Sequence, residues 1–155
     1  MRPLKVLMVG VGTVGEAIAV ISRERPWIET MVLADYDLER ATRVQARVGG
    51  GDSDSAAAGR FPVERIDARD QSQVVALARK HGVDLIMNAA DPRFIPAIFD
   101  GAFEAGVGYL DMATSLSEPH PTDPFNQVGV PLADHQFPKH EEWQAAGRLA
   151  ILGTG

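Results

Sequence analysis

The chain has 155 residues, of which 45% are hydrophobic, and a formal net charge of −6 at neutral pH. This length fits one domain with a real core, and the acidic balance gives no support to nucleic-acid binding, which favours a basic patch. The chain has no cysteine, which excludes disulfides, thiolate metal sites and a cysteine nucleophile and fits a cytoplasmic location. No apolar run reaches the roughly 18 residues that a membrane helix needs, so we expect no membrane partner.

The first predicted unit is a strand, a glycine-rich turn and a helix. Residues 4–9 form an apolar run typical of a strand that is buried on both faces. A helical pattern follows over residues 13–24, and Pro26 is expected to close it. The apolar side chains of this helix fall on one face: Val14, Ala17, Ile18 and Ile21.

Five more strands are expected as short apolar runs, over residues 30–34, 61–66, 83–89, 107–112 and 148–152. Helices are predicted between them, and their ends carry capping signals. Asp37 is the expected N-cap of a helix that runs to about Val48. Asp70 with Gln73 resembles a capping box, and it opens a helix that ends at Gly82.

Proline punctuates the later part of the chain. The pair Asp91-Pro92 forms the cap and first position of one helix, and Pro138 starts a short helix that Gly147 ends. Residues 49–59 are predicted to be a flexible loop. Residues 116–137 carry four of the ten prolines and are predicted to be a loop or lid.

The alternation of strands and helices decides the fold class. Strands that alternate with helices imply right-handed crossovers and a parallel sheet. The sequence therefore predicts an α/β fold, a Rossmann-type doubly wound parallel sheet of six strands in the order 3-2-1-4-5-6.

A G-x-G-x-x-G motif, formed by Gly10, Gly12 and Gly15, lies between the first strand and the first helix. Gly10 permits a tight turn, Gly12 lets a pyrophosphate approach the backbone, and Gly15 lets the helix pack closely. The start of the helix, with Thr13 and Val14, offers free N–H groups and a partial positive charge to phosphates. In this context, the motif indicates a dinucleotide-binding site rather than a simple connecting turn.

The acidic residue Asp35 lies twenty positions after Gly15, at the end of the second predicted strand. A carboxylate at this position accepts hydrogen bonds from the adenosine ribose and repels a 2′-phosphate, for which NADP sites usually supply arginine. Tyr36, not an arginine, follows it, and Arg40 further on is either such an arginine or a solvated surface charge. The sequence therefore favours NAD, with NADP as the alternative.

Ligands of open α/β sheets lie outside the carboxyl ends of the strands, and these ends supply the other candidates. Asp67 follows the third strand and either edges the adenine or is an ordinary loop residue. Ala89, Ala90 and Asp91 follow the fourth strand and are expected near the nicotinamide ribose, although Asp91 is also a helix cap. Asp111 ends the fifth strand and points either to the reactive end of the cofactor or to a neighbouring loop.

No catalytic residue and no metal site is assigned. The four histidines lack the i, i+4 helical spacing of a zinc pair. The sequence also lacks the G-x-S-x-G pattern of a serine nucleophile.

Several segments together resemble the N-terminal half of the saccharopine dehydrogenase family, in particular its bacterial saccharopine or lysine 6-dehydrogenase-like branch. These segments are VLMVGVGTVGEAIA, LADYDLERA, NAADPRF, AGVGYLDMATSL and AGRLAILGTG. The resemblance implies a Rossmann domain that binds NAD or NADP in an oxidoreductase acting on amino-acid C–N bonds. It also implies a second, larger domain that supplies the substrate site and the dimer interface.

The chain ends at residues 153–155, about where the crossover turn of this family begins. We therefore expect residues 1–155 to be a dinucleotide-binding domain without the substrate and dimerisation domain, inactive alone. Apolar residues such as Phe94, Leu116 and Phe125 are then expected to face solvent, which favours a homodimer. Two other functions stay open: a non-catalytic NAD-responsive regulatory or interaction module, and a complete small oxidoreductase that uses Asp91 or Asp111. An epimerase-like or methyltransferase Rossmann domain is disfavoured by the missing Tyr-x-x-x-Lys pattern and by Asp35.

Overall fold

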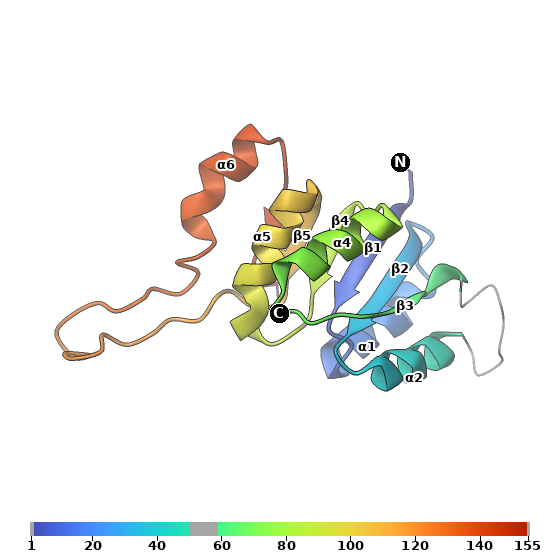
Figure 1. Ribbon diagram of the computed structural model, residues 1–155, viewed down its shortest axis with the longest axis horizontal. Coiled ribbons are helices and arrows are strands. Elements are labelled where there is room, and N and C mark those ends of the chain that lie inside the picture. Colours follow the sequence, from blue (N-terminus) through green and yellow to red (C-terminus); the bar gives the residue numbers. More distant parts are fainter. Residues whose placement is uncertain (1, 50–58, 155) are drawn as a thin grey trace.

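The computed structural model describes residues 2–49 and 59–154, so that most of the loop predicted at 49–59 lies outside the described residues. Its strands form one parallel sheet in the order β3-β2-β1-β4-β5-β6, which confirms the predicted topology (Figure 1). The strands are β1 Leu4–Val9, β2 Ile28–Asp35, β3 Val63–Arg65, β4 Leu85–Asn88, β5 Gly108–Asp111 and β6 Ala150–Ile151.

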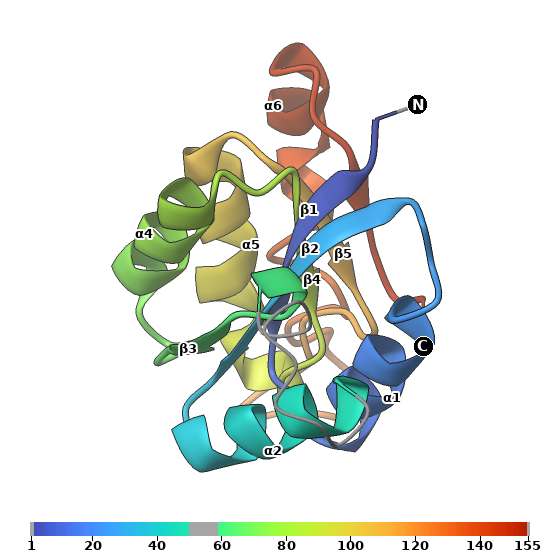
Figure 2. The same cartoon turned by 90° about the vertical axis from the view of Figure 1, so that its right-hand side faces the viewer.

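Helices cover both faces of the sheet, as Figure 2 shows. They are α1 Thr13–Ser22, α2 Leu38–Val48, α4 Gln71–His81, α5 Ile95–Ala105 and α6 His140–Ala145, with short 3-10 turns at Pro92–Phe94 and Phe137–Lys139. Successive residues of β1 point to opposite faces: Val6 and Met8 pack toward α1 and α2, whereas Leu7 and Val9 pack toward α4 and α5. This buried alternation confirms the doubly wound arrangement.

The buried side of helix α1 is rotated from the one that its apolar pattern indicates, and of the four predicted residues only Ile18 packs partly against the core. The side facing the sheet is formed by Gly15, Ala19 and Ser22. Val14 and Ile21 are 51% and 58% exposed. The pattern was misleading because α1 approaches the glycine turn too closely for large side chains, and a Cβ on Gly15 would overlap the carbonyl oxygen of Gly10.

The predicted helix caps are largely confirmed. The carboxylates of Asp37 and Asp70 accept hydrogen bonds from backbone N–H groups in the first turns of α2 and α4. Gly82 ends α4 in the left-handed conformation, with φ +55°. The capping box at Asp70 is only half formed, because the side-chain oxygen of Gln73 accepts from the N–H of Asp67 instead of that of Asp70.

The strands after β2 are shorter than predicted. The third predicted strand, residues 61–66, contains only Val63–Arg65, and the last, residues 148–152, contains only Ala150–Ile151. Apolar runs continue past these strands, but only part of each run lies beside a partner strand. Hydrophobic pattern therefore marked the position of each strand and not its length.

Residues 116–136, the Pro-rich arm, form the extended segment between β5 and α6 in Figure 1. One antiparallel bridge joins its two sides, between Glu118 and Val130. Near its tip, Phe125 and Val128 are 96% and 84% exposed. In the described part of the chain, we find no helix with the length and apolar character needed to span a membrane.

Candidate dinucleotide cleft

A cleft of about 750 Å³ opens at the carboxyl ends of β1, β2, β3 and β4. Its lining comes from the four loops that follow these strands. The residues that line the cleft are Val9, Gly10, Gly12, Asp35, Tyr36, Arg40, Ile66, Asp67, Ala68, Arg69, Ala89, Ala90, Asp91, Arg93 and Phe94. This is the edge at which open α/β sheets hold their ligands.

The glycine turn is tightly packed on one side and open on the other. Gly10 has φ +88°, and a Cβ there would lie 2.8 Å from the backbone nitrogen of Ala90. Gly12 is the N-cap of α1, and a Cβ on it would meet no protein atom within 4 Å. The turn thus needs glycine at position 10 for its own packing, whereas the space at Gly12 is free for a ligand. Backbone and helix dipole make that space suitable for phosphate.

Asp35 is buried and already has three partners within the protein. One carboxylate oxygen accepts the N–H of Val11 at 2.9 Å, and the other accepts the N–H of Asp37 at 2.9 Å. A guanidinium nitrogen of Arg40 lies 3.5 Å from it. Asp35 therefore ties the glycine turn to the end of β2. Since each carboxylate oxygen has further acceptor capacity, it can also accept from a ribose hydroxyl in the cleft.

Two Asp-x-Arg turns with the same geometry lie at the ends of β3 and β4. The carboxylate of Asp67 binds the guanidinium of Arg69 through two hydrogen bonds, at 2.9 and 2.7 Å. Asp91 binds Arg93 in the same way, with both bonds at 2.9 Å. In each turn the carboxylate also accepts the backbone N–H of its arginine.

The electrostatics of these turns follow from the paired guanidiniums. Hydrogen bonds from the side chains of Arg69 and Arg93 are the main cause that lowers the pKa of Asp67 and of Asp91 to about 2. Together with Asp35 and Arg40, the cleft therefore holds three carboxylates and three guanidiniums in pairs. An anionic ligand in the cleft therefore meets carboxylates whose negative charge is balanced by a neighbouring arginine.

Most of the residues predicted from the sequence line this cleft, but three do not. Thr13 lines an adjoining hollow of about 430 Å³ beside α2. Val14 points to solvent, and Gly15 is buried against Gly10. Two arginines of the cleft, Arg69 and Arg93, are absent from the residues that the sequence predicts. The repeated Asp-x-Arg spacing at two strand ends was the signal that could have indicated them.

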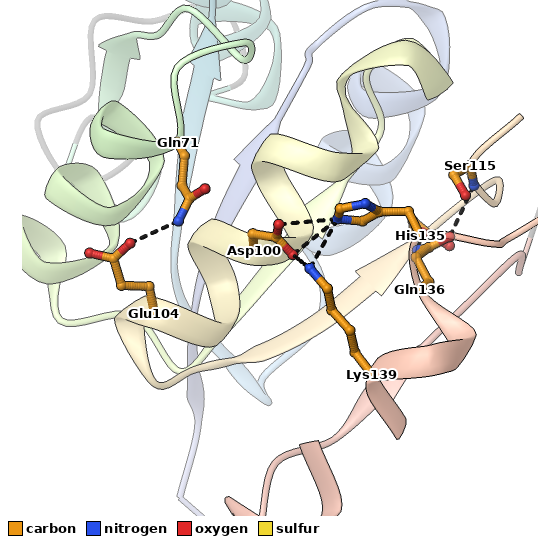
Figure 3. Close-up of polar contacts among 8 residues, drawn as sticks. Gln71, Asp100, Glu104, Ser115, His135, Gln136 and Lys139 are labelled. Carbon is orange, nitrogen blue, oxygen red and sulfur yellow. Dashed lines mark hydrogen bonds and ion pairs between the residues drawn. The ribbon is translucent and has the colours of Figure 1, made fainter. Parts of the chain in front are cut away.

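Asp111 lies in the interior rather than in the cleft. Its carboxylate accepts the side-chain amide of Gln136 at 2.8 Å and the backbone N–H of Gly153 at 2.6 Å. Gln136 in turn accepts the N–H of Ser115, as Figure 3 shows. Of the two roles considered for Asp111, the structure supports the one in which it satisfies neighbouring loops.

A second buried contact joins β4 to β5. The side chain of Asn88 accepts the N–H of Ala90 at 3.0 Å and donates to the hydroxyl of Tyr109 at 3.1 Å. Burial is the main cause that raises the pKa of the Tyr109 hydroxyl, which therefore stays protonated. Asn88 thus holds the loop that carries Ala89 and Ala90 into the cleft.

The base of the arm is attached to α5 by an ionic cluster, drawn in Figure 3. The Nε2 atom of His135 lies 3.1 Å from both carboxylate oxygens of Asp100, and Lys139 pairs with the same carboxylate. Within residues 2–49 and 59–154, no three histidine or acidic side chains are grouped as metal ligands would be. The cluster ties the base of the arm and the turn that precedes α6 to helix α5.

Comparison with known proteins places this geometry in a family context. The model of the saccharopine dehydrogenase NADP-binding domain matches residues 6–151. The chain is 29% identical to a carboxyaminopropylagmatine dehydrogenase from Synechocystis sp., over 97% of this chain and 34% of that protein. It is 24% identical to a carboxynorspermidine synthase from Vibrio cholerae, over 98% of this chain and 36% of that protein.

The fold has close counterparts among solved structures. An apo saccharopine dehydrogenase (L-Glu forming) from Saccharomyces cerevisiae superposes with a TM-score of 0.68 at 15% identity. The match covers 98% of this chain and 27% of that one. The chain spans about a third of the length of the curated relatives that it matches.

Proposed function

Because the chain belongs to the family of saccharopine dehydrogenase NADP-binding domains, we propose that it is the cofactor-binding part of an oxidoreductase. The proposed reaction forms or oxidises a C–N bond in an amine that carries a carboxylate. Hydride transfer in this reaction is the chemistry of the nicotinamide cofactor. The chain itself binds and orients the dinucleotide at the carboxyl edge of its sheet.

The observation that carries this proposal is the open space in front of Gly12. It lies at the N-terminus of α1 and opens into the cleft that Asp35 and the strand-end loops line. A diphosphate fits such a position, because free N–H groups and the helix dipole both favour negative charge there. The adenosine would then lie toward β2 and β3, where Asp35 is within the cleft wall.

The names of the relatives support the substrate class. They refer to carboxyaminopropylagmatine and carboxynorspermidine, which are both carboxylated polyamines. Each relative is roughly three times as long as the matched region, since the match covers 34% and 36% of them. This supports the further proposal that groups of another domain complete the substrate site, so that these 155 residues alone bind cofactor without turning substrate over.

Titration calorimetry with NADH, NADPH and S-adenosylmethionine tests the cofactor proposal. We expect at least one of the two dinucleotides to bind, and we expect no heat of binding for S-adenosylmethionine. Binding of S-adenosylmethionine alone would indicate a methyltransferase-type site and contradict the proposal.

Absorbance at the NADH band, recorded with saccharopine, lysine or carboxynorspermidine and NAD or NADP, tests whether the chain acts alone. We expect no change with these 155 residues. Clear turnover would instead support a complete small oxidoreductase and would make Asp91 the first residue to mutate.

A further inference from the structure

The three arginines of the cleft lie on two sides of the glycine turn. Arg40 and Arg69 follow β2 and β3, whereas Arg93 follows β4. In the sheet, β1 with its glycine turn lies between β2 and β4. A diphosphate at Gly12 would therefore separate Arg93 from the other two arginines.

The side on which Arg93 lies is the nicotinamide side of the proposed cofactor. The acidic residue at the end of β2 marks the adenosine side of a Rossmann site, so that β4 borders the other half. An oxidised nicotinamide ring is a cation, and its charge is left unbalanced because Asp91 already balances the charge of Arg93. The dinucleotide itself carries no anion at that end.

The Asp-x-Arg turn presents Arg93 as a pre-oriented donor. Its Nε and one Nη group bind Asp91, and its other N–H groups are free of Asp91. The side chain is 72% exposed and lines the cleft beside Phe94. A guanidinium fixed in this way loses little side-chain freedom when it binds a carboxylate in a two-point fork.

We infer that Arg93 binds the carboxylate of the substrate at the nicotinamide end of the cleft. This inference rests on the proposed function, because it assumes that a nicotinamide dinucleotide occupies the cleft. The carboxylate would accept from the N–H groups of Arg93 that Asp91 does not use, and it would offset the positive charge of the oxidised ring. Arg69 has the same turn at the opposite end of the cleft and provides a matched internal control.

The test uses the side-chain Nε–H resonances of Arg93 and Arg69 in ¹⁵N NMR spectra of the whole chain, assigned by their loss in Arg93→Gln and Arg69→Gln. NAD, whose nicotinamide ring is oxidised, is added to saturation first, and sodium acetate is then titrated against sodium chloride at equal ionic strength. We expect acetate to shift the Arg93 resonance saturably and to leave Arg69 unmoved. In Arg93→Gln, we expect acetate binding to weaken by about fivefold or more.

Three results would overturn the inference. The first is an equal response of both arginines to acetate, which would indicate a general salt effect. The second is an Arg93 resonance that moves with NAD and not with acetate, which would assign Arg93 to the phosphates of the cofactor. The third is unchanged acetate binding in Arg93→Gln. A chain that binds no dinucleotide in the first step would instead contradict the proposed function.

Discussion

At the scale of single residues, Gly12 and Gly15 lie three positions apart and have opposite surroundings. A Cβ on Gly12 meets no protein atom within 4 Å, whereas one on Gly15 would overlap the carbonyl of Gly10. Gly12→Val should therefore place its side chain where the diphosphate lies, weakening NADH binding about tenfold or more while changing the free energy of unfolding by only about 1 kcal/mol.

Gly15→Val is the matched control for Gly12→Val. It should lower the free energy of unfolding by about 1–3 kcal/mol or more, because α1 would have to move away from the turn. Calorimetric titration and urea unfolding of both variants measure the two effects separately. Undiminished NADH affinity in Gly12→Val would mean that the glycine motif is only a turn.

The choice between NADH and NADPH is a second property of single residues. Asp35 places a carboxylate in the cleft, and Arg40 lies 3.5 Å from it. We expect the chain to prefer NADH, because the carboxylate repels a 2′-phosphate. Asp35→Ser should narrow this preference, and Arg40→Gln should widen it by removing the counter-charge. Dissociation constants for the two cofactors test this, and a preference for NADPH in the parent chain would show that Arg40 dominates.

At the scale of elements, the turns after β3 and β4 predict part of the acid sensitivity. The pKa of Asp67 and that of Asp91 fall from the ordinary 3.8 to about 2 in the folded chain. A carboxylate with a depressed folded-state pKa stabilises the fold above its unfolded pKa, and this contribution is lost as the pH falls. The affected window therefore lies between about pH 4 and pH 2.

As the pH is lowered through this window, the free energy of unfolding should fall less in the double variant Asp67→Asn, Asp91→Asn than in the parent chain. Part of the pH dependence of the free energy of unfolding should remain in this variant, because other carboxylates, among them Asp37 and Asp70, also have a lowered pKa. Urea unfolding at several pH values measures this pH dependence, with Asp134→Asn, at an exposed carboxylate of the arm, as control. Identical slopes in the parent and the double variant would show that the two turns do not contribute to stability.

The end of β5 depends on a buried carboxylate. Asp111 accepts from Gln136 and Gly153, which lie 25 and 42 residues further along the chain. Asp111→Ala should leave both donors unsatisfied and lower the free energy of unfolding by about 1–3 kcal/mol, with a loosened attachment of β6. Hydrogen exchange at the Gly153 amide should accelerate as well. Unchanged exchange there would contradict this role of Asp111.

At the scale of the whole molecule, two segments after β5 carry exposed apolar side chains. They include Phe125 and Val128 in the Pro-rich arm and Leu149 and Ile151 at the edge of the sheet. Leu116 and Phe125 are exposed as expected from the sequence, whereas Phe94 packs partly against the core. Exposed apolar side chains favour association, and for identical chains a symmetric pair is the simplest form.

We therefore expect the molar mass from light scattering to rise with protein concentration toward that of a homodimer. The double variant Phe125→Ser, Val128→Ser should shift this rise to higher concentration, because both side chains belong to the arm. Monomer mass at all concentrations would contradict the proposed apolar interface.

The sequence alone determined the features that depend on neighbouring residues. Caps such as Asp37 and Asp70 bind N–H groups two or three positions away, and Gly82 ends its own helix. The alternation of apolar runs and helices then sufficed for the strand order, because right-handed crossovers leave few arrangements of a parallel sheet. The glycine motif and Asp35 likewise marked the correct edge of that sheet.

Only the tertiary structure decided which groups share a surface. The exposed side of α1 follows from its close approach to the glycine turn, which no helical period reveals. Each Asp-x-Arg pair is local, yet only the parallel sheet brings both pairs to one cleft. Asp111 points inward because Gly153, distant in the chain, donates to it. Local geometry is encoded within a few residues, whereas the composition of a site depends on contacts between segments that are far apart in sequence.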